Sequence, residues 1–464
     1  MINLKQKQSD ALELMKSGKN VFLTGKAGTG KSYITNMFTE WAEANDKKIL
    51  ICAPTGIAAL NIGGSTVHRV FKLPIDYVSN SYELNTSTET KDLLKAADIV
   101  LIDEVSMLRA DTFSHVESKM RESSNKSGSS FGGKQVIVVG DYYQLAPVVK
   151  NNEKQTIVKD YGGQYSFEAN AWKSANFNLV ELDEVVRQDD LKFVDALNSI
   201  RERNAYSTSA LAYINQNTIK NGGEPVTLCF TNKVAEQVNN AKLKELDETP
   251  QDFYAVTTGK VANGDKSVPD LLTLKVGAKI IFCVNDKDGD YVNGTTGYIT
   301  SLNPVVVDNK IEVERFKWEI KEPVKNEQTG RIEHDVIGTY EQLPIKLAWA
   351  ITVHKSQGST IKDRVHLKLD GSFRPHGALY VALSRCTDIA NLSLERDLGT
   401  YDLQVDEKVR TALLSMSSGK TSIEIPAYSI KLFELLSSAI DKNPSEEQLQ
   451  QMINRLEIWN KKLC

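Results

Sequence analysis

Residues 21–32 read Val-Phe-Leu-Thr-Gly-Lys-Ala-Gly-Thr-Gly-Lys-Ser, and this stretch decides how the first part of the chain folds. Its first four residues, Val21–Thr24, predict a short buried strand. The residues that follow match the pattern Gly-x-x-x-x-Gly-Lys-Ser, and a helical pattern then runs from Tyr33 to Ala44. A strand, a glycine-rich loop and a helix in this order form the setting in which such a loop cradles phosphate groups.

The loop residues supply the groups that a triphosphate needs. Gly28 and Gly30 let the backbone bend so that successive N–H groups point at phosphate oxygens. Lys31 adds a positive charge near the β- and γ-phosphates, and Ser32 offers its hydroxyl to Mg²⁺. A plain glycine-rich turn before an amphipathic helix is the alternative. We predict a nucleoside triphosphate site with Mg²⁺, made by Gly25, Gly28, Thr29, Gly30, Lys31 and Ser32.

Composition limits the class of protein. The chain has 464 residues, of which 41% are apolar and 25% charged, which is typical of a globular protein with more than one domain. The net charge of −4 argues against a generally basic, polyanion-binding surface but leaves room for a local nucleic-acid groove. No apolar run approaches the ~20 residues of a membrane span. The five cysteines are dispersed, which favours a reducing cytoplasm over a disulfide framework or a zinc site.

The first ~180 residues alternate short apolar runs with helical patterns, which indicates a parallel α/β sheet. A second alternating unit is split into residues 226–249 and 345–394. Between these parts, short β-like runs and glycine-containing turns predict a small inserted β-barrel. Polar loops are expected at Ser79–Lys91 and Ser123–Gly133. The predicted strands are Val21–Thr24, Lys48–Cys52, Ile99–Ile102, Val136–Val139, Leu179–Leu182, Val226–Phe230, Val365–Leu369 and Leu392–Leu394.

Two of these strands end in polar residues with a known chemistry. Ile99–Ile102 runs into Asp103 and Glu104. Beside a phosphate-binding loop, the first acid holds Mg²⁺ through water and the second polarises the water that attacks the γ-phosphate. Gln144 follows Val136–Val139, and its amide can donate to phosphate and accept from water. We expect these three residues to act in nucleotide hydrolysis.

Two of the arginines beyond the first α/β unit stand out, Arg187 and Arg385. An arginine that reaches across a cleft to the γ-phosphate stabilises transition-state charge and can contribute about 10³–10⁵ in rate. A surface salt bridge is the alternative for either arginine taken alone.

The order of the motifs resembles a known family. The sequence is similar to the Pif-family DNA helicases of the Pif-one type, in the 5′-to-3′ branch of helicase superfamily one. Phe131-Gly-Gly-Lys-Gln135 resembles the end of the signature that separates this family from RecD-like relatives. The other matching stretches are Gln8-x-x-Ala11, Gly25–Ser32, Ala53–Ala59, Thr66–Phe71, Asp103–Met107, Gly140–Leu145, Arg187-Gln188, Val292–Gly294 with Gly297, Ala348–Gly358 and Tyr380–Arg385.

The resemblance implies an α/β fold with two RecA-like P-loop domains, each with a parallel sheet, and a small inserted β-barrel domain. The expected segments are 1–183 (first RecA-like domain, with a subdomain at about 65–90), 184–249 and 344–400 (second RecA-like domain), 250–343 (inserted barrel) and 401–464 (helical extension).

The resemblance also assigns residues to ATP and DNA. Gln8 is implied to read the adenine edge, and Arg187, Gly358 and Arg385 to complete the ATP site from the second domain. For Phe71, stacking on a base and burial in the small subdomain both stay open. A single-strand track is implied at Thr55, Thr66, His68, Phe71, Thr231, Asn232, His354 and Lys355.

The motifs and the resemblance together predict an ATP-dependent DNA helicase, with ATP and Mg²⁺ as cofactors. Its 5′-to-3′ movement on single-stranded DNA is implied by the resemblance alone. Duplex, forked and G-quadruplex DNA are the candidate substrates, and repair, recombination and replication the candidate pathways. A nucleotide-gated single-strand-binding or scaffold protein and a RecD-like or RNA-directed motor are the alternatives. We expect a cytoplasmic monomer, bacterial or phage-encoded rather than nuclear, with a DNA-induced dimer left open.

Overall fold

The computed structural model describes residues 4–79, 86–184, 190–219, 224–358, 360–361, 363–369 and 375–417. The predicted Arg187 and the amphipathic stretch expected after residue 446 lie outside these ranges. Residues 1–410 form one compact unit, and residues 411–464 are a second unit. All contacts described below lie within the first unit.

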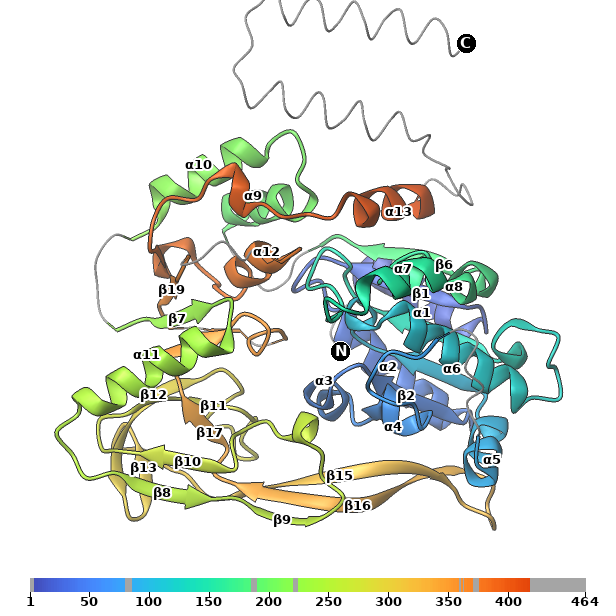
Figure 1. Cartoon of the computed structure of the whole chain (residues 1–464), viewed down its shortest axis with the longest axis horizontal. Helices are drawn as coiled ribbons and strands as arrows, with labels where there is room; N and C mark the ends of the chain where they lie inside the picture. The colour runs from blue at the N-terminus through green and yellow to red at the C-terminus, as the bar shows by residue number, and fades with distance from the viewer. Residues whose placement is uncertain are drawn as a thin grey trace, which may run out of the picture. The chain divides into compact units, whose positions relative to one another are not determined.

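The first sheet has six parallel strands in the order β3-β2-β4-β5-β1-β6 (Figure 1). All five strands predicted for this part of the chain form, with ends shifted by at most one residue from the expected positions. The two-residue strand β3 was not predicted. The strands are β1 (Val21–Gly25), β2 (Ile49–Ala53), β3 (Ser65–Thr66), β4 (Ile99–Ile102), β5 (Gln135–Val139) and β6 (Asn178–Leu182).

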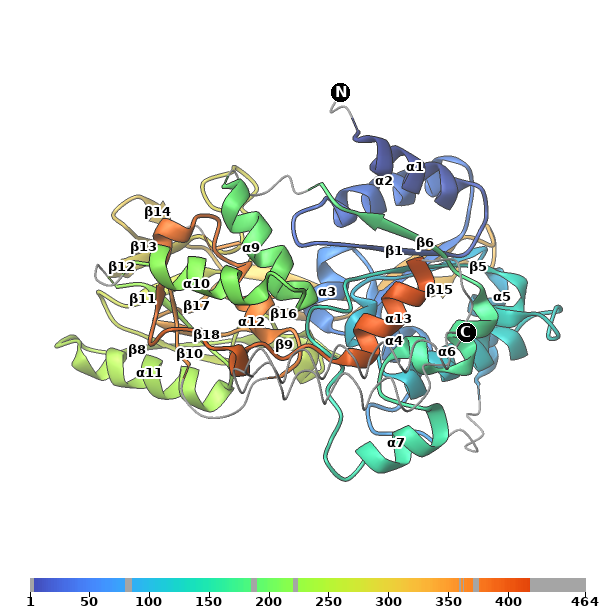
Figure 2. The ribbon, with the colours of Figure 1, turned by 90° about the horizontal axis from the view of Figure 1, so that it is seen from above.

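Helices cover both faces of the first sheet, because successive strand residues point to opposite sides. Val21 and Leu23 face α1 (Gln6–Lys16) and α2 (Lys31–Ala44), which Figure 2 shows lying together over one face. Phe22 faces the other way and packs against the rings of Trp172 and Tyr142, with centroids 5.2 and 5.5 Å away. The remaining helices of this part are α3 (Gly56–Asn61), α4 (Val67–Val70), α5 (Thr88–Ala96), α6 (Ala110–Glu122), α7 (Lys154–Tyr161) and α8 (Asn170–Ala175).

The predicted loop 79–91 is partly wrong, because α5 begins within it at Thr88. The Ser87 hydroxyl accepts a hydrogen bond from the Thr90 N–H and caps the helix. Leu93 and Leu94 are buried and anchor it. The polar composition of the segment hid this capping signal.

The second sheet has four parallel strands in the order β18-β7-β19-β20. Its strand β7 precedes the all-β segment described below, and its other three strands follow that segment. Of the four strands, only β18 was not predicted. The strands are β7 (Val226–Cys229), β18 (Ala350–Thr352), β19 (Val365–Leu367) and β20 (Leu392–Leu394), and the helices are α9 (Leu191–Glu202), α10 (Ser207–Asn217), α11 (Asn232–Glu245) and α12 (Ala378–Leu383).

Residues 251–347 form an all-β segment as predicted. Its strands are distributed over three antiparallel sheets, so a closed barrel stays a prediction, as do the domain boundaries. The long β15–β16 hairpin extends to α5 of the first sheet (Figure 1). The strands are β8 (Gln251–Tyr254), β9 (Val256–Gly259), β10 (Leu271–Leu274), β11 (Lys279–Phe282), β12 (Thr296–Leu302), β13 (Val305–Val307), β14 (Ile311–Glu312), β15 (Phe316–Lys325), β16 (Ile332–Gln342) and β17 (Ile345–Leu347).

The last described helix is α13 (Glu407–Ser417). None of the helices in the described part of the chain is both long and apolar enough to span a lipid bilayer.

The Phe22 ring is fully buried against aromatic neighbours, so Phe22→Ala leaves a cavity under the first sheet. We expect a loss of about 3–5 kcal/mol in the free energy of unfolding. The midpoint of the urea transition, followed by tryptophan fluorescence, measures this loss. The matched Ile75→Ala variant removes a side chain that is 77% exposed and should leave the midpoint nearly unchanged. Equal shifts in both variants would contradict the assignment of Phe22 to the core.

Candidate nucleotide and nucleic-acid site

The glycine-rich loop leaves β1 at Gly25 and enters α2 at Lys31, as the sequence predicted. Gly28 and Gly30 have φ values of 79° and 89°, a region that side chains with a Cβ rarely adopt. A Cβ on Gly30 would also lie 2.7 Å from Nε2 of Gln8. The bend that directs the first N–H groups of α2 toward a phosphate therefore requires glycine at these positions.

A cavity of about 380 Å³ lies over this loop, a volume in the range of ligand sites. Residues of both sheets line it, so neither sheet forms the site alone. The lining residues are Ala27, Gly28, Thr29, Gly30, Lys31, Ser32, Tyr33, Glu104 and Gln144 from the first sheet's part of the chain, and Gly358 and Arg385 from the second's.

The Lys31 side chain is held inside the loop. Its Nζ donates hydrogen bonds to the carbonyl oxygens of Gly25, at 2.7 Å, and Lys26, at 3.0 Å. Burial lowers the pKa of this amine, while the charges of Asp141 and Glu104 oppose that shift. The ammonium thus lies within the loop that lines the cavity.

Two acids follow β4. Asp103 accepts a hydrogen bond from the Glu104 N–H at 2.8 Å, and burial raises the pKa of its carboxyl. Glu104 has φ 48° and ψ 41°, a left-handed conformation that is strained for a residue with a side chain. Burial, followed by the charge of Asp103, raises the pKa of Glu104 to about 7. A carboxyl that titrates near neutral pH can take up a proton from water.

Gln357 is a residue of the site that sequence reasoning missed. Its Nε2 donates to Oε2 of Glu104 at 3.2 Å and approaches Oε1 of Gln144 at 3.4 Å. The Gln144 amide in turn donates to Asp141 at 3.4 Å. Gln357 follows β18 and directly precedes the predicted Gly358, so its position beside a motif glycine was the available signal. Its contact with Glu104 depends on how the two sheets face each other, which sequence does not specify.

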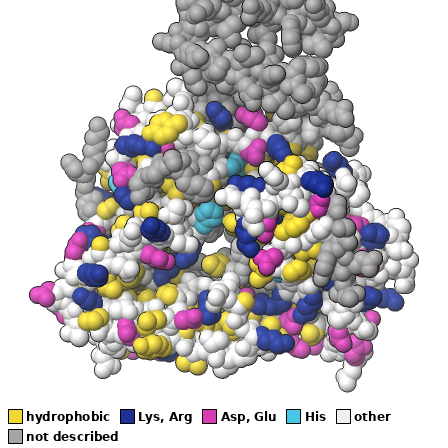
Figure 3. Space-filling model, viewed as in Figure 1, with side chains coloured by type: hydrophobic (Ala, Val, Ile, Leu, Met, Phe, Trp, Pro, Cys, Tyr) yellow, Lys and Arg dark blue, Asp and Glu magenta, His cyan; other side chains and the backbone are white. Residues whose placement is uncertain are grey.

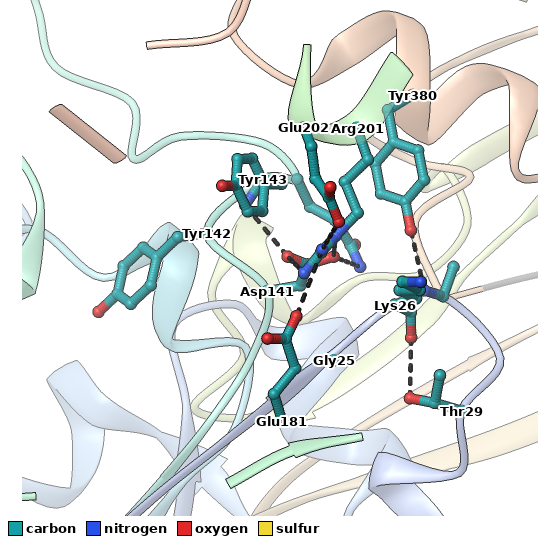
Figure 4. A network of polar contacts seen from close by, with 12 residues as sticks. Gly25, Lys26, Thr29, Asp141, Tyr142, Tyr143, Glu181, Arg201, Glu202 and Tyr380 are labelled. Carbon is teal, nitrogen blue, oxygen red and sulfur yellow. Dashed lines mark hydrogen bonds and ion pairs between the residues drawn. The ribbon is translucent and has the colours of Figure 1, made fainter. Parts of the chain in front are cut away.

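Arg385 lies on the side of the cavity formed by the second sheet. It is buried, and its guanidinium donates to the Val381 carbonyl and the Ser384 hydroxyl, each at 2.9 Å. Its charge lowers the pKa of Glu104, which opposes the shift caused by burial. A second contact joins the sheets, because the Ala27 N–H in the loop donates to Oη of Tyr380 at 2.9 Å (Figure 4).

Gln8 lies beside the loop. Its Nε2 donates to the Thr29 carbonyl at 3.0 Å, and its Oε1 accepts from the Lys5 N–H at 3.1 Å. One end of the amide therefore supports the loop and the other caps the start of α1. Recognition of adenine by Gln8 stays a prediction.

The donor set fits Mg²⁺, which prefers oxygen ligands and keeps several waters. Ser32 and Asp103 bring a hydroxyl and a carboxylate to one neighbouring cavity. Within the described ranges, no group of three or more His, Cys, Asp and Glu side chains has the arrangement of a protein-only metal site. The residues thus suit an ion that is held jointly with phosphate oxygens.

This neighbouring cavity, of about 760 Å³, is continuous in its lining with the nucleotide site, since Ser32, Glu104 and Gly358 line both. Thr55, His354 and Lys355 of the predicted single-strand track also line it. Burial lowers the pKa values of His354 and Lys355. Figure 3 shows one face of the molecule with a central hollow and with basic and acidic side chains interspersed, which agrees with the net charge of −4.

The other predicted track residues do not line this cavity. Thr231 and Asn232 are exposed where α11 begins, and Thr66 and His68 lie at α4. Thr55, Thr66 and Thr231 share one local role, because each hydroxyl caps a helix by accepting the N–H three residues later. Burial and the charge of Arg109 lower the pKa of His68.

The structure corrects the assignment of Phe71 to the single-strand track. Its ring is fully buried, so it presents no face on which a base could stack. Of the two alternatives that the sequence left open, the structure favours burial, and Phe71 is removed from the candidate track.

The chain is similar in sequence and in structure to known helicases. A family model described as PIF1-like helicase matches residues 3–210. The ATP-dependent DNA helicase Pif1 of Campylobacter jejuni is 32% identical over 425 residues, covering 83% of this chain and 90% of that protein. A crystal structure of Bacteroides Pif1 with ADP-AlF4 has a TM-score of 0.81 at 30% identity, covering 90% of this chain and 98% of that one. A Bacteroides structure with ADP-AlF3 and single-stranded DNA has a TM-score of 0.65 at 30% identity, with the same coverage. These matches confirm the resemblance predicted from the motifs.

The raised pKa of Glu104 makes stability depend on pH. Because folding raises this pKa from 4.5 to about 7, the folded state is favoured at low pH, and this advantage is lost as pH rises through about 7. Glu104→Gln removes the ionisation, so we expect the variant to melt above the wild type at pH 8 and to match it near pH 4.5. Thermal unfolding without nucleotide or Mg²⁺ measures the difference. Glu248→Gln, at an exposed position, is the control and should show no such trend. A pH-independent difference for Glu104→Gln would contradict the shift.

Proposed function

This chain belongs to the PIF1-like helicase family, and from that premise we propose that it is an ATP-dependent DNA helicase. We propose further that it moves 5′-to-3′ along single-stranded DNA and opens duplex or forked DNA. One observation carries the proposal: the nucleotide cavity is lined by residues of both sheets, from the glycine-rich loop to Arg385. The parts of the molecule built on the first and on the second sheet are called its two halves below. A nucleotide in this position contacts both halves at once, so its binding and release can change how the halves are held together.

The second cavity supplies the link to DNA. It shares Ser32, Glu104 and Gly358 with the nucleotide cavity. If each half holds the strand with an affinity that depends on nucleotide state, hydrolysis moves the strand in one direction. Separation of one base pair requires ~1–2 kcal/mol of stacking free energy, a modest load for one turnover.

The phosphate groups are assigned to the loop. We propose that the first N–H groups of α2 and the Lys31 ammonium bind the phosphates of ATP. Ser32 and Asp103 hold Mg²⁺, which when bound neutralises charge on the phosphate oxygens. The close hydrogen bonds of Lys31 to loop carbonyls support this assignment, since they keep the charge within the loop that lines the cavity.

The hydrolytic step is assigned to groups from both halves. Glu104 accepts a proton from the attacking water, Gln144 contacts the γ-phosphate, and Arg385 stabilises the charge that develops there. Gln357 orients Glu104 through the hydrogen bond that joins their side chains. Arg187, outside the described residues, keeps its proposed role as a second arginine at the phosphate.

The DNA track is proposed at Thr55, His354 and Lys355 in the second cavity, with Thr66, His68, Thr231 and Asn232 extending it. Polar groups of this kind grip the sugar–phosphate backbone without reading sequence. Burial lowers the pKa values of both His354 and Lys355. We propose that this sequence-independent grip is released in every cycle.

The remaining assignments are coarser. A cytoplasmic location is proposed from the dispersed cysteines of the sequence. The relatives bear the name Pif1, which favours a Pif-type motor over a RecD-like or RNA-directed one. The rival function is that of a single-strand-binding protein that is gated by nucleotide and does not translocate. The experiment below distinguishes the two.

Strand displacement on two partial duplexes, one with a 5′ and one with a 3′ single-stranded tail, tests the function. With ATP and Mg²⁺, we expect opening of the 5′-tailed duplex alone. Lys31→Ala removes the ammonium at the phosphates and should abolish opening. Opening of the 3′-tailed duplex would overturn the proposed direction. DNA-stimulated ATP hydrolysis without opening of either duplex would indicate a translocase or a gated binding protein.

Gln357→Ala tests the contact across the cleft. Because Glu104 loses an orienting hydrogen bond, we expect kcat for DNA-stimulated ATP hydrolysis to fall by about tenfold or more. KM for ATP should change little, since Gln357 lines the second cavity and not the nucleotide cavity. Gln404→Ala, an exposed amide on the second half, is the control. An unchanged kcat would remove Gln357 from the hydrolytic site.

A further inference from the structure

The turn after β5, residues 140–144, carries Gln144 into the nucleotide cavity, and its conformation depends on one carboxylate. Asp141 is fully buried. Its oxygens accept hydrogen bonds from the Tyr143 N–H, at 3.1 Å, and from the Gln144 amide, at 3.4 Å. The position of the Gln144 side chain therefore follows the position of the Asp141 carboxylate.

The partner of this carboxylate comes from the other half of the molecule. Arg201, near the end of α9, donates from Nε and Nη2 to the two oxygens of Asp141 at 3.1 and 2.9 Å (Figure 4). Its side chain is 1% exposed and lies over the Tyr143 ring at 4.5 Å. The outer edge of the guanidinium lies 3.5 and 3.4 Å from Glu181 and Glu202. Arg201 and Asp141 thus form a buried, bidentate ion pair across the cleft.

Helix α9 is packed onto the second sheet. Its residues Phe193, Leu197 and Ile200 share one core cluster with β7 and β19. Arg201 directly follows Ile200, so its backbone is fixed to that core. A displacement of the second sheet therefore displaces the guanidinium that holds Asp141.

Other groups of the second half also contact the turn. His376 accepts the Asp406 N–H at Nδ1, so its Nε2 carries the proton and donates to the Tyr142 carbonyl at 2.7 Å. The Gly377 backbone approaches the carbonyls of Tyr143 and Gln144 so closely that a Cβ there would lie 2.4 and 2.3 Å from them. The turn is thus enclosed by the second half, and Arg201 supplies its only described guanidinium contact.

We propose that Arg201 is a positioning residue for ATP hydrolysis: it holds Asp141 and, through it, sets the position of Gln144 according to the separation of the two sheets. This inference rests on the proposed function and extends it. The bidentate geometry matters, because a lysine in the same place supplies a charge but not the planar fork. Loss of the fork should loosen the turn without removing any group from the phosphate-binding loop.

Arg201→Lys is the first variant to measure, in the full chain with ATP, Mg²⁺ and single-stranded DNA. We expect kcat for DNA-stimulated hydrolysis to fall by about 10–100-fold, as for a displaced catalytic group, with KM for ATP nearly unchanged. Arg396→Lys is the matched control. Arg396 also makes a bidentate pair with a buried aspartate, Asp402, at 2.8 Å and lies over Tyr401 at 4.7 Å, within the second half. This control should keep the wild-type kcat.

A double-mutant cycle separates a positioning role from a purely structural one. Arg201→Gln alone leaves a buried carboxylate without its cation and can unfold the protein. Arg201→Gln combined with Asp141→Asn removes both charges and should fold. If Arg201 acts through Asp141, adding Arg201→Gln to the Asp141→Asn variant should not lower kcat further.

Two results would overturn the inference. The first is a wild-type kcat for Arg201→Lys, and the second is an independent, multiplicative loss in the double variant. An inactive wild type would instead contradict the proposed function itself, so the two failures are distinguishable. Thermal unfolding of each variant confirms that the measured protein is folded.

Discussion

The structure depends on the burial of opposite charges in the cleft between the two sheets. Ionised groups removed from water must be paired, since an isolated buried charge is strongly unfavourable. The cleft meets this requirement with groups from both halves: of the six named next, the first sheet's part of the chain supplies three carboxylates and one amine, and the second supplies two arginines. The groups are Lys31, Asp103, Glu104, Asp141, Arg201 and Arg385.

The same charges set the chemistry of the site. Burial and the neighbouring Asp103 raise the pKa of Glu104 to about 7, while Lys31 and Arg385 limit the rise. Because Arg385 belongs to the second half, the proton affinity of Glu104 depends on how near that half lies. Under the proposed role of Glu104, hydrolysis and the spacing of the two sheets would therefore be linked by electrostatics.

Backbone geometry fixes the remaining groups. Glu104 occupies a left-handed conformation immediately after a buried strand, and the glycine loop bends at Gly28 and Gly30. Such conformations persist only where surrounding packing holds them. Here the parallel strands β4, β5 and β1 lie side by side in the sheet, so their carboxyl ends bring Asp103, Asp141 and the loop to one edge.

The sequence by itself determined the local parts of this protein. Buried strands are short apolar runs, and the loop and acids follow them at fixed spacing. Five of the six strands of the first sheet, the P-loop and Asp103 with Glu104 were therefore predictable. Only the tertiary structure decided which side chains meet across the cleft. It brought Gln357 to Glu104 and Arg201 to Asp141, used Gln8 to support the loop, and buried Phe71. These outcomes depend on the packing of segments up to 253 residues apart, and no local pattern encodes that packing.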